Sequence, residues 1–111
     1  MQKITPEELL RSVRFNADGL VPVIAQQYDT GEVLMMAWAN ETALKETLQT
    51  RRMCYFSRSH QQLWRKGETS GHTQKLIEMR IDCDGDTLLA LIDQTGAACH
   101  TNNRSCFYRG L

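Results

Sequence analysis

Three of the four cysteines have the chemistry of a zinc site: Cys83, Cys99 and Cys106. In a reducing compartment disulfides are rare, and thiolates more often bind metal or do chemistry. Three thiolates satisfy zinc and leave a fourth tetrahedral position for water, which is the arrangement of a catalytic site. Cys54 would close a structural site as a fourth ligand, or it packs as a small buried hydrophobe, as all four cysteines could. Because the chain has no Cys-x-x-Cys pair, the spacing alone leaves these interpretations open.

A histidine directly follows one of these cysteines, at His100. An imidazole in this position could bind the metal, act as a general base, or satisfy a backbone carbonyl. The residue types alone leave the three roles open.

The segment Asp82-Cys83-Asp84-Gly85-Asp86 gathers three carboxylates within five residues. In an extended strand, alternate side chains share a face, so the three aspartates would converge while Cys83 points away. Such carboxylates repel one another unless a hard cation such as magnesium or calcium neutralises them. A solvated hairpin turn at Asp84-Gly85 is the alternative. A helix–loop–helix calcium loop is excluded, because its sixth position is Thr87 and an apolar strand-like run follows.

The stretch from Arg51 to Gly67 carries five cationic side chains and one histidine but no acid. Its hydroxyls, backbone amides and Trp64 would suit phosphates and a stacked base. A solvated hairpin face with Trp64 in the core is the alternative. Single-stranded nucleic acid is a further candidate ligand, but the formal net charge of +0 counts against it.

One domain of 111 residues must position these groups. A first helix is predicted from Pro6, capped by Thr5, and a second over residues 41–50, capped by Asn40. Strands are predicted over residues 20–28 and 33–39, joined by a hairpin, and over 53–56, 75–83 and 88–92. In the fourth of these strands, Ile77, Met79, Ile81 and Cys83 alternate with polar residues and should share one face. The pattern predicts an α+β domain of mainly antiparallel strands with two short helices.

The composition excludes several classes of protein. The chain is 41% hydrophobic and 23% charged, as in ordinary globular domains. No apolar run approaches the ~20 residues of a transmembrane helix, and the first residues do not form a signal peptide. We therefore expect neither a membrane nor a secreted protein, and no nucleic-acid partner.

Four segments in series resemble the phosphoribosyl-AMP cyclohydrolase family of histidine biosynthesis. They are Tyr55-Phe-Ser-Arg-Ser59, Leu63-Trp-Arg-Lys-Gly-Glu-Thr-Ser-Gly71, Asp82-Cys-Asp-Gly-Asp86, and Ala98-Cys-His-Thr101 with Ser105-Cys-Phe107. The resemblance spans about residues 20 to 109. It implies a cytoplasmic homodimer of intertwined subunits, with zinc sites completed across the interface. It also implies one cyclohydrolase domain over residues 1–111, and we expect no C-terminal pyrophosphohydrolase domain.

Carried over by position, the resemblance implies that Cys83, Cys99 and Cys106 bind zinc. It likewise implies that Asp82, Asp84 and Asp86 bind magnesium. Two positions depart from the family pattern: His60 stands where arginine or a similar residue is expected, and Asn102 where glycine is usual.

The implied reaction is hydrolytic opening of the adenine ring of phosphoribosyl-AMP. Water attacks carbon 6, and the bond between nitrogen 1 and carbon 6 breaks. His100 is the candidate for moving protons. The candidate substrate-binding residues are Ser57, Arg58, Ser59, Trp64, Arg65, Lys66 and Ser70.

Two rival functions follow from the same residues. A zinc-stabilised binding module would use the basic stretch to contact RNA or a protein, and would have a closed four-ligand site that includes Cys54. A zinc deaminase attacks the same purine carbon, but the chain lacks its His-x-Glu and Pro-Cys-x-x-Cys elements.

Overall fold

Both helices begin at the predicted capping residues in the computed structural model, which describes residues 1–111. Helix α1 (Pro6–Ser12) follows Thr5, whose hydroxyl accepts a 3.1 Å hydrogen bond from the Glu8 amide. Helix α2 (Glu41–Thr50) follows Asn40, whose side-chain oxygen accepts a 2.8 Å bond from the Ala43 amide. These side chains satisfy amides that the first turn of a helix leaves unpaired.

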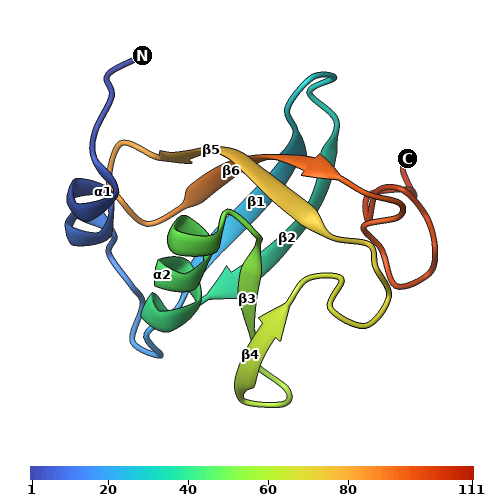
Figure 1. Cartoon of the computed structure of the whole chain (residues 1–111), viewed down its shortest axis with the longest axis horizontal. Helices are drawn as coiled ribbons and strands as arrows, with labels where there is room; N and C mark the ends of the chain where they lie inside the picture. The colour runs from blue at the N-terminus through green and yellow to red at the C-terminus, as the bar shows by residue number, and fades with distance from the viewer.

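A four-stranded sheet forms the centre of the molecule, in the order β2-β1-β6-β5 (Figure 1). The strands are β1 (Val21–Gln27), β2 (Val33–Ala39), β5 (Gln74–Ile81) and β6 (Leu88–Gln94). The pairs β1–β2 and β5–β6 are antiparallel hairpins, whereas β1 and β6 pair in parallel. The sheet is therefore mixed, because the two hairpins meet through strands that run in the same direction. The prediction of mainly antiparallel strands is confirmed for two of the three pairs in this sheet, and the parallel β1–β6 pair is the exception.

A second, two-stranded sheet consists of β3 (Cys54–Ser57) and β4 (Gln62–Arg65), paired antiparallel. The sequence pattern predicted the first of these strands but left β4 within a polar stretch. Trp64 on β4 is 41% exposed, so it does not belong to the core. The hairpin projects away from the larger sheet (Figure 1).

The alternation predicted over residues 75–83 is wrong at two residues: β5 ends at Ile81, so Cys83 lies outside the strand, and Ile77 departs from the pattern. Leu76 pairs with Ile92 and Glu78 pairs with Leu91, so Ile77 is an extra residue in the ladder. A bulge of this kind shifts the alternation of side chains by one position. Ile77 is consequently 41% exposed, while Met79 and Ile81 pack against the core.

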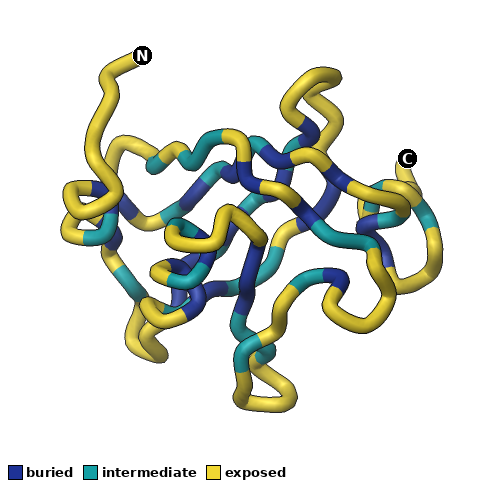
Figure 2. The backbone as a smooth tube through the Cα atoms, viewed as in Figure 1, coloured by how far each residue is buried: buried dark blue, intermediate teal, exposed yellow.

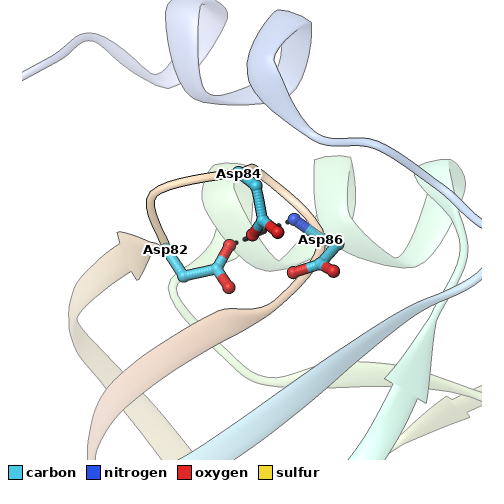
Figure 3. A group of neighbouring side chains, drawn as sticks. All are labelled: Asp82, Asp84 and Asp86. Carbon is cyan, nitrogen blue, oxygen red and sulfur yellow. Dashed lines mark hydrogen bonds between the residues drawn. The ribbon is translucent and has the colours of Figure 1, made fainter.

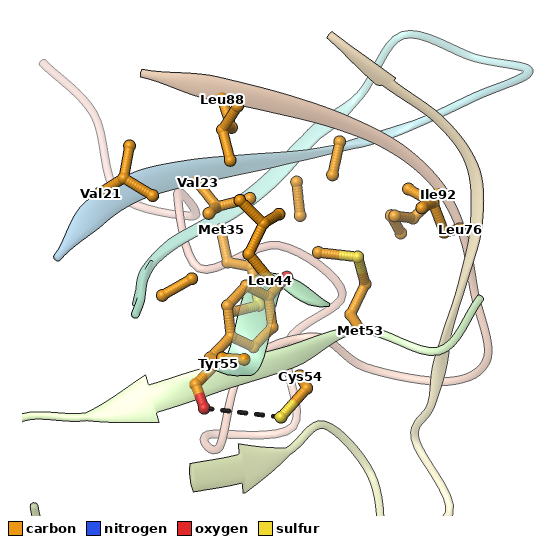
Figure 4. Packing of buried hydrophobic residues seen from close by; sticks show 14 of the residues in the cluster. Val21, Val23, Met35, Leu44, Met53, Cys54, Tyr55, Leu76, Leu88 and Ile92 are labelled. Atoms are coloured by element: carbon orange, nitrogen blue, oxygen red, sulfur yellow. Dashed lines mark hydrogen bonds between the residues drawn. The ribbon is translucent and has the colours of Figure 1, made fainter. Parts of the chain in front are cut away.

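The core lies between the larger sheet and the elements that cover one of its faces (Figures 2 and 4). Leu44 from α2 and Tyr55 from β3 pack with Val21, Val23 and Leu88 from the sheet. Burial of apolar side chains of this size contributes about 1.5–3 kcal/mol each. The core therefore fixes β3 and β6, the strands from which the candidate site extends. No helix has the length and apolar character needed to cross a membrane.

Candidate functional site

A cleft of about 720 Å³ lies between β2, β4 with the loop that follows it, and the C-terminal loop. Seven of the predicted site residues line this cleft: Trp64, Arg65, Lys66, Ser70, Cys99, His100 and Cys106. The fold thus brings together residues that are distant in the sequence. The cleft contains the candidate proton carrier, two of the three candidate zinc ligands, and cationic side chains.

The C-terminal loop has a defined backbone that brings two cysteines to the cleft. The amides of Ala98 and Cys99 donate to the carbonyls of Arg104 and Asn103, at 3.0 and 3.2 Å. Asn102 closes the turn at a φ of 71°, a left-handed conformation that glycine adopts most easily and asparagine tolerates. The departure from glycine at this position therefore preserves the shape of the turn.

The two cleft cysteines influence each other's pKa and have different environments. The Cys99 sulfur lies 2.9 Å from the Thr101 hydroxyl, and this contact lowers the pKa of the Cys99 thiol. Burial is the main cause that raises the pKa of the Cys106 thiol, and its interaction with Cys99 raises this pKa further. Two adjacent sulfurs with a hydroxyl donor form a soft donor set of the kind that zinc prefers.

Lys66 joins the two loops that border the cleft. Its ammonium donates a 2.7 Å hydrogen bond to the Ala98 carbonyl and lies 5.3 Å from the centre of the Trp64 ring. Burial lowers the pKa of Lys66, while Cys106 and Cys99 act in the opposite direction. A partly buried cation thus lies beside the two thiols and the aromatic face.

The third predicted zinc ligand lies outside this cleft. Cys83 is exposed on the turn between β5 and β6, whereas Cys99 follows the other end of β6. Seven strand residues at roughly 3.3 Å each separate these ends by about 20 Å. A single chain therefore does not bring its three candidate zinc ligands together.

The acidic turn gathers its three carboxylates as predicted, but by a different geometry. One oxygen each from Asp82, Asp84 and Asp86 lie within 4.8 Å of one another (Figure 3). The segment is a turn and not an extended strand, because Asp82 accepts hydrogen bonds from the amides of Asp86 and Thr87. Contact with Asp84 and Asp82 raises the pKa of Asp86. Carboxylates this close favour a hard cation.

The acidic turn packs tightly against the end of α1. The Gly85 carbonyl accepts a 2.7 Å bond from the Arg14 amide, and a Cβ at Gly85 would lie 2.4 Å from the Ser12 carbonyl oxygen. Gly85 also has a φ of 79°. Only glycine fits this position, so the aspartates are held on a fixed support.

Three predicted substrate-binding residues lie away from the cleft, at the tip of the β3–β4 hairpin. The hydroxyls of Ser57 and Ser59 lie 3.1 and 3.3 Å from Nδ1 of His60. The Arg58 guanidinium lies 5.0 Å from the centre of the Trp38 ring. Within one chain, the predicted substrate-binding set is therefore divided between two places.

Arg65 borders the cleft, but its charge is already paired. Its Nε and Nη2 donate to the two carboxylate oxygens of Glu46 on α2, at 2.8 and 2.9 Å. This contact lowers the pKa of Glu46. The bidentate pair fixes β4 on α2, which gives Arg65 a structural role that its position in a basic stretch did not reveal.

His72 and Cys54 lie in different parts of the structure, the first at the cleft and the second in the core. His72 lines the cleft, and a Cβ at Gly96 would lie 2.6 Å from its ring. Apart from its residue type, no pattern in the sequence indicates a role for His72. Cys54 is 1% exposed on β3, and burial raises its pKa to about 12. A buried, protonated thiol outside the cleft is a core residue, which disfavours the closed four-ligand site.

The chain is similar in sequence to known proteins of one family. The family model described as phosphoribosyl-AMP cyclohydrolase matches residues 35–108. The phosphoribosyl-AMP cyclohydrolases of Rhodospirillum rubrum and Granulibacter bethesdensis are each 68% identical to this chain, over 90% and 89% of its length and 70% and 77% of theirs. That of Paramagnetospirillum magneticum is 62% identical over 97% of this chain and 82% of its own. The chain belongs to the phosphoribosyl-AMP cyclohydrolase family, enzymes of histidine biosynthesis.

Proposed function

We propose that this enzyme is a zinc-dependent hydrolase that opens the adenine ring of phosphoribosyl-AMP between nitrogen 1 and carbon 6. The observation that carries the proposal is the meeting of Cys99, Cys106 and His100 on one cleft of a chain with this family membership. The substrate carries a ribosyl group on nitrogen 1, which withdraws electrons and makes carbon 6 a better electrophile.

The donor sets fit two different metals. The sulfurs of Cys99 and Cys106 suit zinc, and the oxygens of Asp82, Asp84 and Asp86 suit magnesium. When bound, zinc lowers the pKa of a coordinated water, so that a nucleophile is available near neutral pH. Magnesium at the acidic turn would neutralise its carboxylates and offset phosphate charge.

The zinc site is completed by a second copy of the chain. Cys83 precedes the far end of β6, a strand about 20 Å long, so the third thiolate of each site comes from the partner. The acidic turn that carries Cys83 accompanies it to the partner's cleft. Exposed apolar side chains provide surface for such an interface: Tyr28, Met36, Phe107 and Tyr108 are 46–63% exposed.

The cleft residues divide the remaining work. His100 is exposed on the cleft wall, where it accepts a proton as water adds to carbon 6. It returns a proton to nitrogen 1 as the bond to carbon 6 breaks, so that a carbonyl remains. Trp64 offers a face for the base. Lys66 and Ser70 of this cleft, with Ser57, Arg58 and Ser59 of the hairpin tip, hold the phosphates; an unchanged KM in Lys66→Met would remove that residue from this role.

The proposal includes a cytoplasmic location, because free thiolates persist where disulfides are rare. Recovery of the protein from an oxidising compartment on cell fractionation would contradict it.

His100→Ala is expected to retain zinc and to lower kcat by roughly 10²- to 10⁴-fold, the range for loss of a general acid or base. The side chain is exposed, so the fold should be unaffected. Zinc content and kcat are measured on the same sample and compared with those of the wild-type enzyme. Full turnover in His100→Ala would exclude the residue from the mechanism.

Metal removal tests the proposed function directly. Ring opening is followed by the ultraviolet band of the purine, on chelator-treated protein that receives zinc, magnesium or both. We expect activity only when zinc is restored, and maximal activity only with both metals. Asp84→Asn should require more magnesium at unchanged zinc content, because one of three carboxylates is lost. Full activity of metal-free protein would overturn the proposal, and an unchanged magnesium requirement would reject the acidic site.

A further inference from the structure

Three buried glutamines form one hydrogen-bonded chain that extends to a loop of the cleft. Gln27, Gln74 and Gln94 are only 4%, 0% and 6% exposed. The Tyr55 hydroxyl donates to Oε1 of Gln74 at 2.6 Å, and Nε2 of Gln74 donates to Oε1 of Gln94 at 2.8 Å. Nε2 of Gln27 continues the chain to Asp29 and Asp93, at 3.0 and 2.9 Å.

Gln94 is the member of this chain that reaches the loops of the cleft. Its Nε2 donates to the Thr95 carbonyl at 3.0 Å and to the His72 carbonyl at 3.4 Å. Its backbone amide donates to Oε1 of Gln27 at 2.9 Å. One side chain therefore joins the loop that ends at His72 with the loop that leads to Cys99.

Neighbouring contacts hold the same junction. The Thr95 amide donates to the Thr73 carbonyl at 3.0 Å. The Arg104 guanidinium donates to the carbonyls of Gln94 and Gly96, at 3.4 and 3.3 Å. The Gly96 backbone in turn lies against the His72 ring. Gln94 is thus the buried centre of the contacts that set the spacing of the two loops.

The choice of glutamine has a chemical reason. Burial of polar groups costs free energy unless every group is paired, and an apolar side chain of the same size would avoid this cost. An amide both donates and accepts, so it bridges the Gln74 amide group and two carbonyls without a charge. All buried side-chain polar atoms of the molecule have a partner. The directional hydrogen bonds of Gln94 therefore fix the relative positions of the two loops more closely than apolar packing would.

We propose that Gln94 is a positioning residue of the ring-opening reaction, which holds the Cys99 loop against the His72 loop. The inference rests on the proposed function, because it assumes that the Cys99 loop binds zinc. Removal of a residue that orients metal-binding groups typically lowers metal affinity or activity by about 10- to 100-fold. We therefore expect Gln94 to act on kcat and zinc retention, with little effect on KM.

The test compares two glutamines of the same chain of hydrogen bonds. Gln94→Met removes the donor to both loops, and Gln27→Met is the matched control, since Gln27 is equally buried but its side chain contacts neither loop carbonyl. Gln94→Asn retains an uncharged amide that is too short for both carbonyls, and it serves if Gln94→Met does not fold. Measurements are kcat, KM, zinc release to a chromophoric chelator, melting temperature, and hydrogen exchange over residues 67–73 and 95–106.

We expect the Gln94 variants to lose about 10- to 100-fold in kcat and to release zinc faster by a similar factor. Exchange in both loops should increase, also in metal-free protein, while Gln27→Met lowers the melting temperature without these changes. Equal losses of kcat in Gln94 and Gln27 variants, or unchanged kcat and zinc release in the Gln94 variants, would overturn the inference. A wild-type enzyme that is active without zinc would instead refute the proposed function.

Discussion

Replacement of Cys99 by alanine is expected to abolish stoichiometric zinc binding and to lower ring opening by roughly 10³-fold or more, because a direct ligand should matter more than its supporting partners. The side chain lies at the cleft surface of a loop held by several backbone hydrogen bonds. Loss of the sulfur should therefore leave the fold intact. Zinc is measured by atomic absorption and ring opening by ultraviolet absorbance.

Cys54→Ala is the matched control for this variant. Cys54 is buried on β3 and does not line the cleft. Its loss should lower the free energy of unfolding by about 1–2 kcal/mol while zinc content and turnover stay at wild-type levels. If Cys99→Ala kept its zinc and turnover, or if Cys54→Ala lost both, the assignment of ligands would be wrong.

Mixing two inactive variants, Cys83→Ala and Cys99→Ala, is expected to restore activity. In a symmetric pair with shared sites, a mixed dimer has one site with two defects and one site with none. Random exchange makes half of the dimers mixed, so activity should reach about one quarter of the wild-type value. The measurement is ring opening after the two proteins are unfolded together and refolded.

The control mixture combines Cys99→Ala with Cys106→Ala. Both residues line the same cleft of one chain, so every site in a mixed dimer carries one defect and no activity should return. Recovery in this control, or no recovery with Cys83→Ala, would contradict a zinc site shared between subunits.

Local signals in the sequence predicted local structure well. The capping residues Thr5 and Asn40 determine where the two helices begin, because they satisfy amides within three residues of themselves. The hairpin between β1 and β2 is encoded in the same way. The convergence of the three aspartates was also predictable, because any compact path through residues 82–86 keeps them close.

Features that depend on distant partners could not be predicted in this way. The parallel pairing of β1 with β6 joins residues more than 60 positions apart, and no local pattern encodes it. The bulge at Ile77 depends on the register with β6. Arg65 belonged by sequence to a basic stretch, and only the position of α2 shows that Glu46 pairs with it. The separation of Cys83 from Cys99 likewise follows from the direction of β6 in the sheet.

Strand β6 carries a candidate metal-binding end on each side, with Cys83 before it and Cys99 after it. In a twofold pair each chain supplies one end to either site. In the proposed pair, the length of β6 would set the distance between the two zinc sites, on the order of 20 Å. Because a centrally paired strand cannot stretch, the proposed pair would hold its two reaction centres at a constant separation, and each centre would act on its own substrate molecule.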